Sequence, residues 1–136
     1  MDTVVLTVET GHRAGTTDLT PEAARFVAGR GDGLLNVFVP HATAALAIIE
    51  TGAGSDLDLI DRIDVLLPRD DSLYRHRHGS PGHGADHLLP AFLPPSVGIP
   101  VIDGRLTLGT WQSILLVDTN TDNPRRQVRL SFLPGH

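Results

Sequence analysis

The sequence contains no cysteine. This absence excludes disulfide bonds and thiolate metal sites, so a transition-metal site would have to be built from imidazole and carboxylate groups. No apolar run approaches the roughly 20 residues that are needed to cross a bilayer. The start Met1-Asp2-Thr3-Val4 also lacks the basic residues of a secretory signal. We therefore expect no membrane association and a cytoplasmic location.

Positive charge is scarce as well. The chain has 11 basic and 16 acidic residues, which gives a formal net charge of −5. Basic residues are scattered apart from Arg125-Arg126, and this distribution argues against nucleic acid as the main partner. The alternative of a small anionic ligand that binds in a local basic pocket stays open. Because 136 residues suit one hydrophobic core, we expect a single domain over residues 1–136.

The hydrophobic pattern predicts an α+β fold. Two positions carry sharp local signals: Thr20 as an N-cap before Pro21, and Asp103-Gly104 as a hairpin turn, where both central residues must accept positive φ. We expect a β-sandwich-like arrangement of mixed or antiparallel sheets with two to three short helices. The predicted strands are 4–8, 34–39, 44–50, 99–102, 106–108, 113–117 and 127–132, and the predicted helices are 20–27, 55–67 and 85–92.

The segment 69–84 is polar, rich in Gly, His and Arg, and without periodicity, which is typical of a functional loop. In an extended chain His76 and His78 point the same way, and His83 shares a helical face with His87 if the helix begins early. These imidazoles could meet at one cation. The alternative is an exposed loop of solvated histidines.

Other polar residues stand at strand ends. His41 precedes a run of small residues and is either a ligand or a core histidine with satisfied hydrogen bonds. Glu50 ends an apolar strand, where its carboxylate is either paired with His or Arg, or solvated. Trp111 is more typical of a core than of a ligand platform. Arg125 and Arg126 could grip a phosphate, or could belong to a solvated turn.

Five ordered motifs lie between about residue 34 and residue 132. In chain order they are similar to H-[ST]-[ST]-A-x-L-x-I-x-E at 41–50, Y-x-H at 74–76, A-H-I-K-A around His87, I-P-x-x-x-G-x-L-x-L-G-T-W-Q at 99–112 and P-R at 124–125. This set resembles the motifs of the YjbQ-like family, small proteins linked to a secondary thiamine phosphate synthase activity. The chain departs from the family at Thr51, Asp86 and Gln127, where Asn, Ala and Arg are usual.

The resemblance implies a homotrimer with a histidine-lined pocket near the subunit boundaries. It also implies a reaction that joins hydroxymethylpyrimidine diphosphate to a thiazole phosphate and releases pyrophosphate. The metal ligands expected on this basis are His41, His76 and His87, with zinc or magnesium as the divalent ion. The alternative is that these histidines bind the phosphate directly. The expected catalytic residues are His41, Thr43, Glu50, Trp111 and Gln112, and the expected phosphate-binding residues are Thr110 and Arg125.

Two other functions stay open at this point. One is a metal-dependent hydrolase with an open coordination position for water. The other is a non-enzymatic trimeric protein that binds a metal or a metabolite. The sequence leaves the identity of the metal, the natural substrate, and the participation of His78 and His83 undecided.

Overall fold

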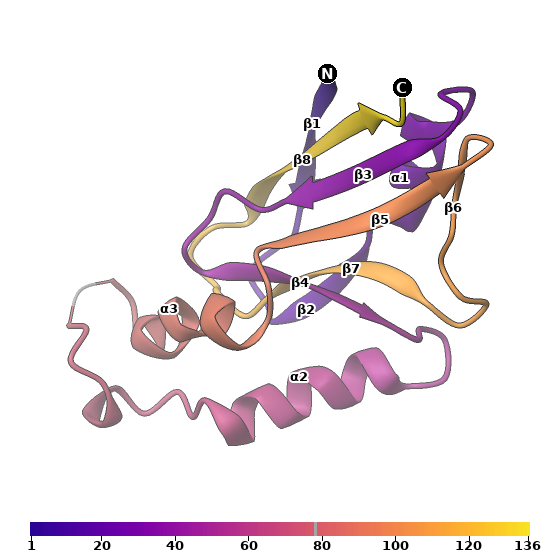
Figure 1. The fold of residues 1–136 in the computed structure, drawn as a ribbon. Coiled ribbons are helices and arrows are strands. Elements are labelled where there is room, and N and C mark those ends of the chain that lie inside the picture. The colour runs from indigo at the N-terminus through magenta and orange to yellow at the C-terminus, as the bar shows by residue number, and fades with distance from the viewer. Residues whose placement is uncertain (78) are drawn as a thin grey trace.

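The computed structural model describes residues 1–77 and 79–136, and these residues form an α+β protein (Figure 1). The α+β prediction with antiparallel sheets and short helices is therefore confirmed. In chain order the elements are β1 (Asp2–Glu9), β2 (Gly15–Asp18), α1 (Thr20–Val27), β3 (Gly33–Phe38), β4 (Ala44–Ile49), α2 (Ser55–Leu66), the 3-10 helix η1 (Asp71–Leu73), α3 (His83–Phe92), β5 (Ser96–Ile102), β6 (Arg105–Leu106), β7 (Ser113–Asp118) and β8 (Arg125–Pro134).

The strands form two antiparallel sheets. A five-stranded sheet has the order β1-β8-β3-β5-β6, and a three-stranded sheet has the order β2-β7-β4. One hydrophobic cluster joins the two sheets to α1, and a second cluster joins the three-stranded sheet to α2 and α3. The small sheet is thus the middle layer, between the large sheet and the helices α2 and α3 (Figure 1).

This middle position explains the unbroken apolar sequence of β4. Alternate side chains of a strand point to opposite faces, and both faces of β4 are covered. Ala44 and Leu46 belong to the cluster on the side of the large sheet. Ala45 and Ala47 belong to the cluster on the side of α2 and α3. The helices can therefore lie close to the sheet, since the side chains under them are small.

The tight hairpin between β5 and β6 forms as predicted, with φ of 51° at Asp103 and 71° at Gly104. The predicted N-cap role of Thr20 is wrong, because its hydroxyl instead accepts the Ile114 N–H at 2.9 Å. Strand β2 is not among the strands that the sequence predicts. Its Gly-Thr-Thr-Asp sequence has no alternation, and pairing with β7 at the sheet edge makes it a strand. Within the described residues, no helix has the length and apolar character of a membrane span.

The pairing of β4 with β7 distinguishes two ends of the three-stranded sheet. Ala44 pairs with Asp118 at one end, and Ile49 pairs with Ser113 at the other. Five residue steps along a strand cover about 17 Å. We call the first of these the Asp118 end and the second the Ser113 end. Helix α3 lies at the Asp118 end (Figure 1).

Candidate metal centre and adjoining cavity

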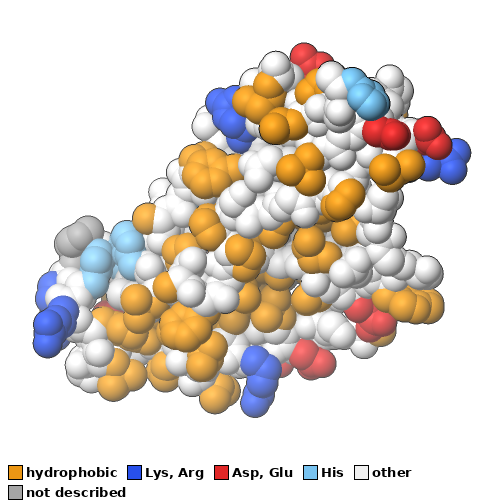
Figure 2. All heavy atoms as spheres, in the orientation of Figure 1, with side chains coloured by type: hydrophobic (Ala, Val, Ile, Leu, Met, Phe, Trp, Pro, Cys, Tyr) orange, Lys and Arg blue, Asp and Glu red, His pale blue; other side chains and the backbone are white. Residues whose placement is uncertain are grey.

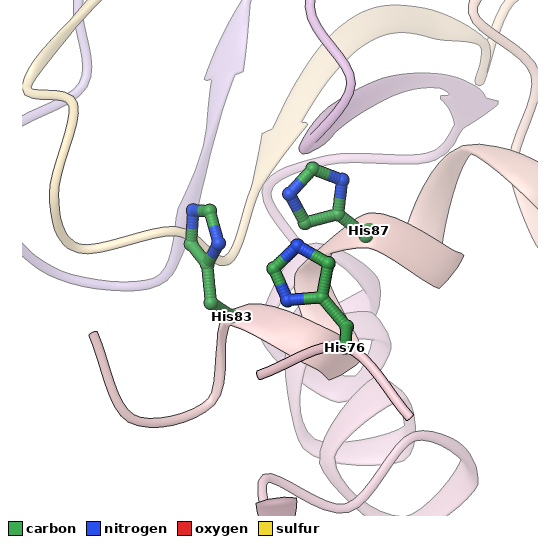
Figure 3. A group of neighbouring side chains, drawn as sticks. All are labelled: His76, His83 and His87. Carbon is green, nitrogen blue, oxygen red and sulfur yellow. The ribbon is translucent and has the colours of Figure 1, made fainter. Parts of the chain in front are cut away.

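Three histidines meet at the first turns of α3. His83 and His87 are four residues apart on this helix, so their side chains leave the same face. His76 comes from the segment between η1 and α3, and Figure 3 shows its ring turned toward the other two. Because α3 begins at His83, the early helix start on which the sequence prediction depended is present.

The geometry of this His76–His83–His87 triad suits one small ion. Each ring offers a nitrogen, and these atoms all lie within 4.8 Å of one another. The ring centroids are 4.3 Å apart for His76 and His87, 4.7 Å for His83 and His87, and 5.3 Å for His76 and His83. A tetrahedral zinc ion would hold its nitrogen ligands about 3.4 Å apart, so a pair at the 4.8 Å limit would have to close by about 1.4 Å. Three imidazoles would leave the fourth coordination position open.

The backbone before α3 is shaped to bring its histidines together. Gly79 has φ of +88°, and a Cβ at this position would lie 2.5 Å from His83 Nδ1. The segment is tied down on both sides, since Tyr74 Oη donates to the Pro68 carbonyl at 2.6 Å and the Gly82 N–H donates to Asp71 Oδ1 at 3.0 Å. A side chain at Gly79 would therefore displace the His83 ring.

Helix α3 is also held from below by a buried carboxylate. Asp86 is 1% exposed and lies between the two helical histidines in the sequence. Its oxygens accept hydrogen bonds from Arg69, from Thr119 Oγ1 at 2.8 Å and from Asn120 Nδ2 at 3.1 Å. Asp86 raises the pKa of Arg69 above its ordinary value, although burial by itself lowers it. This network fixes the helix to the chain that leaves β7.

A cavity of about 310 Å³ opens beside the triad. Two of its wall residues, His83 and His87, belong to the triad. The other lining residues include polar side chains and two arginines. Figure 2 shows histidine and basic side chains on the surface near this end of the molecule. The full lining is Pro40, His41, Ala42, Thr43, His83, His87, Asn123, Arg125 and Arg126. A metal on the triad would thus lie beside a cavity whose arginines can attract an anion.

The two arginines of the cavity differ in their surroundings. Arg126 is 2% exposed, and its guanidinium donates to both oxygens of Asp118, at 2.6 and 3.0 Å, and to Thr43 Oγ1 at 2.8 Å. Arg125 is mostly exposed and donates to Glu9 at 2.8 Å. Arg126 is therefore part of the frame, whereas Arg125 is able to move toward a ligand. Thr43, predicted to be catalytic, lies in the wall and holds Arg126 in place.

The structure places His41 in the cavity wall but not in the triad. Its Nε2 accepts the backbone N–H of Gln127 at 2.9 Å. Burial, followed by the positive charge of Arg126, lowers the pKa of His41 below its ordinary value. His83 stands where the sequence prediction had His41, because a helical spacing of four residues brings His83 beside His87. His78 lies outside the described residues.

The other predicted site residues lie at the Ser113 end. Trp111 is 74% exposed, and Thr110 beside it is exposed too. Gln112 accepts the Gly109 N–H at 2.8 Å, and Glu50 accepts the Ser55 hydroxyl at 3.4 Å. Since these residues stand about 17 Å along the sheet from Asp118, they cannot reach the triad of their own chain. Their predicted roles require a second subunit.

Sequence reasoning gave no site role to Asp86, Arg69 or Asn120. The signal for Asp86 was present, because an acidic residue in an apolar helical segment with Ala85, Leu88 and Leu89 needs a buried partner. Its partners lie 17 and 34 residues away in sequence, so no local pattern identifies them.

The fold and the triad define a class: α+β proteins with a three-histidine geometry that could hold a metal ion. More specifically, the chain belongs to the YjbQ-like family, because the family model described as "UPF0047 protein YjbQ-like" matches residues 4–135. This finding agrees with the resemblance seen in the sequence motifs.

Curated relatives and solved structures support the same assignment. A UPF0047 protein of Mycobacterium tuberculosis is 65% identical over 99% of this chain and 100% of its own length. A UPF0047 protein of Archaeoglobus fulgidus is 36% identical over 90% of this chain and 95% of its own. The crystal structure of a hypothetical protein from Aeropyrum pernix is 34% identical, with a TM-score of 0.83, and the match covers 98% of this chain and 99% of that one.

Proposed function

We propose that this protein binds a divalent transition-metal ion on His76, His83 and His87, and holds a small phosphorylated substrate in the adjoining cavity. The observation that carries this proposal is the approach of three ring nitrogens to within 4.8 Å of one another. Imidazole ligands favour zinc and its neighbours, whereas magnesium prefers oxygen ligands, so zinc is the better candidate of the two expected ions.

The reaction implied by the family resemblance fits this arrangement. The C–O bond between the pyrimidine methylene and its diphosphate would break, the thiazole nitrogen would bond to the methylene carbon, and the electron pair would leave on pyrophosphate. A metal ion bound at the triad would supply positive charge to the departing oxygens. Arg125 would bind a phosphate from the opposite wall, since its side chain is exposed and can reorient.

Metal content is the first test. The protein, purified without a histidine tag, is analysed for metals, stripped with a chelator, and titrated with zinc by calorimetry. We expect one zinc ion per chain, with affinity falling on acidification because protonated imidazole cannot bind a metal. His87→Ala should lower the affinity at least about 100-fold, while the control His12→Ala should leave it unchanged. If the wild-type protein takes up no transition metal, the proposal fails.

A metal-dependent hydrolase is the second candidate, and it is favoured by the coordination position that three imidazoles leave open for water. The two reactions are separable with one set of substrates. Condensation gives thiamine phosphate and pyrophosphate from two phosphorylated precursors, whereas hydrolysis releases phosphate from either one alone. Phosphate release without a condensation product would select the hydrolase.

We also propose a homotrimer in which the Ser113 end of one subunit lies against the Asp118 end of the next. The predicted residues Glu50, Thr110, Trp111 and Gln112 stand at the Ser113 end, which is the opposite end of the three-stranded sheet from the cavity of their own chain. A head-to-tail contact between subunits that closes into a ring would bring these four residues of each subunit to the cavity of the next subunit. The exposure of Trp111 supports such a contact.

A further inference from the structure

We propose that His41 is a neutral hydrogen-bond donor, through Nδ1–H, to the ligand in the cavity, and not a ligand of the metal. The identity of the ligand rests on the proposed function. The position of the proton on His41 is argued from one hydrogen bond to the backbone of Gln127. It assigns a recognition role to a residue that the sequence motifs place among the metal ligands.

The contact to Gln127 fixes which ring nitrogen carries the proton. The backbone N–H of Gln127 can only donate, and it points at His41 Nε2 from 2.9 Å. Nε2 must therefore offer its lone pair and be unprotonated. A neutral imidazole has one N–H, so that hydrogen is on Nδ1.

This tautomer excludes two other roles for His41. Metal binding through Nδ1 would need a lone pair there, and moving the proton to Nε2 would set two N–H groups against each other. An imidazolium ion would create the same clash. The lowered pKa of His41, caused first by burial and then by the charge of Arg126, agrees with a neutral ring, although Asp118 and the backbone contact with Gln127 act in the raising direction.

The remaining polar atom that His41 can offer to the cavity is Nδ1. The same lining carries the donors of Arg125 and Asn123, so a ligand seated there meets hydrogen-bond donors on several sides. The chemistry that such a wall recognises is an acceptor oxygen, as in a phosphate. The cavity thus has a division of roles, with metal ligands on α3 and a donor wall at 41–43 and 123–126.

The test uses two amide variants that separate the two nitrogens. His41→Gln places an acceptor near the Nε2 position and keeps a partner for the Gln127 N–H, but lacks the Nδ1 donor. His41→Asn places an amide N–H near the Nδ1 position. The zinc-loaded wild type and both variants are titrated with inorganic phosphate, and zinc affinity is measured by competition with a chelator. His12→Ala serves as the matched control for loss of an imidazole outside the cavity.

We expect zinc affinity to stay within about threefold of wild type in both variants. Phosphate affinity should fall about 10- to 100-fold in His41→Gln, as for loss of one hydrogen bond to a charged group, and should be largely retained in His41→Asn. A loss of zinc affinity in His41→Gln as large as that in His87→Ala would show that His41 is a ligand and would overturn the inference. Unchanged phosphate affinity in His41→Gln would overturn it too.

A second measurement is independent of the proposed function. In metal-free protein with ¹⁵N-labelled histidine, NMR at neutral pH should show Nδ1 of His41 as the protonated nitrogen and Nε2 as the bare one. The opposite tautomer, or a charged ring, would refute the inference even if zinc binds as proposed. If zinc does not bind but the Nδ1–H tautomer is found, the proposed function fails and the assignment of the proton stands.

Discussion

Replacing Asp86 tests whether the buried polar network holds the candidate metal centre in place. Asp86→Ala removes a carboxylate that is 1% exposed and accepts hydrogen bonds from three side chains. Removing one partner of a fully buried ion pair costs about 3–5 kcal/mol, because the other charge loses its compensation. Arg69 is partly exposed and also donates to the Thr119 carbonyl at 3.1 Å, so water and that carbonyl reduce the cost. We expect a loss of about 2–4 kcal/mol in the free energy of unfolding.

The assay combines urea denaturation with zinc titration. For a chain of this size an m-value of about 1.5 kcal/mol/M converts the loss into a midpoint lowered by about 1–3 M urea. Zinc affinity should fall at least about 10-fold under conditions where the variant is folded, as expected when groups that orient metal ligands are removed. The control is Asp2→Ala, which breaks the exposed pair with Arg30 and should cost less than about 1 kcal/mol without affecting zinc.

A double variant distinguishes two effects of losing Asp86: the loss of the hydrogen bonds that hold α3, and the loss of the charge that compensates Arg69. Arg69→Met combined with Asp86→Ala leaves no uncompensated guanidinium, so part of the lost stability should return. Zinc affinity should stay low, because α3 is still without its tie to Arg69, Thr119 and Asn120. If Asp86→Ala matched Asp2→Ala in both stability and zinc affinity, the reasoning about this network would be refuted.

Three further predictions concern other parts of the molecule. Gly79→Ala and Gly52→Ala should each cost about 1 kcal/mol in stability, since both glycines have positive φ, but only Gly79→Ala should weaken zinc binding, because a Cβ there meets His83 whereas Gly52 faces open space. Equal zinc titrations for the two variants would contradict this. In metal-free protein, the folded state holds the pKa of His41 below 6.5, so the unfolded chain takes up a proton that the folded chain resists. The stabilisation from this residue is thus present above pH 6.5 and is lost as pH falls through the lowered pKa, and urea titrations between about pH 7.5 and 5.5 should show a shallower pH dependence for His41→Gln. Finally, light scattering should give a mass of about three times the 14.6 kDa of one chain. The fluorescence of the single tryptophan, Trp111, should be protected from quenching in the assembly and should become quenchable on dilution. A monomer at all concentrations would exclude the proposed ring.

Much of the fold could be predicted because the pattern of apolar residues and the tertiary structure agree. Strand β4 shows this well, since an unbroken apolar run is expected where both faces of a strand are covered. The hairpin at Asp103-Gly104 depends only on local backbone geometry. Strand β2 could not be predicted in this way, because its place is set by pairing with the distant β7 and not by its own composition.

The candidate site was predictable to the extent that it is local. His83 and His87 follow a helical spacing that the sequence displays, and His76 lies only seven residues before His83. The position of His41 was harder, because its ring is directed by the backbone of Gln127, 86 residues further along the chain. No pattern within either segment encodes that contact. Placing Trp111 and Gln112 far from the triad likewise required the register of β4 and β7.

The end of β7 ties the two walls of the cavity together. Asp118, the last residue of the strand, holds Arg126 in the donor wall by accepting two hydrogen bonds, of 2.6 and 3.0 Å. The next two residues, Thr119 and Asn120, bind the carboxylate of Asp86 and so hold α3 with its histidines. Three consecutive buried residues therefore set the distance between the metal-binding face and the donor wall. A shift of the chain at this point would move both walls, whereas side chains that line only one wall can change without disturbing the other.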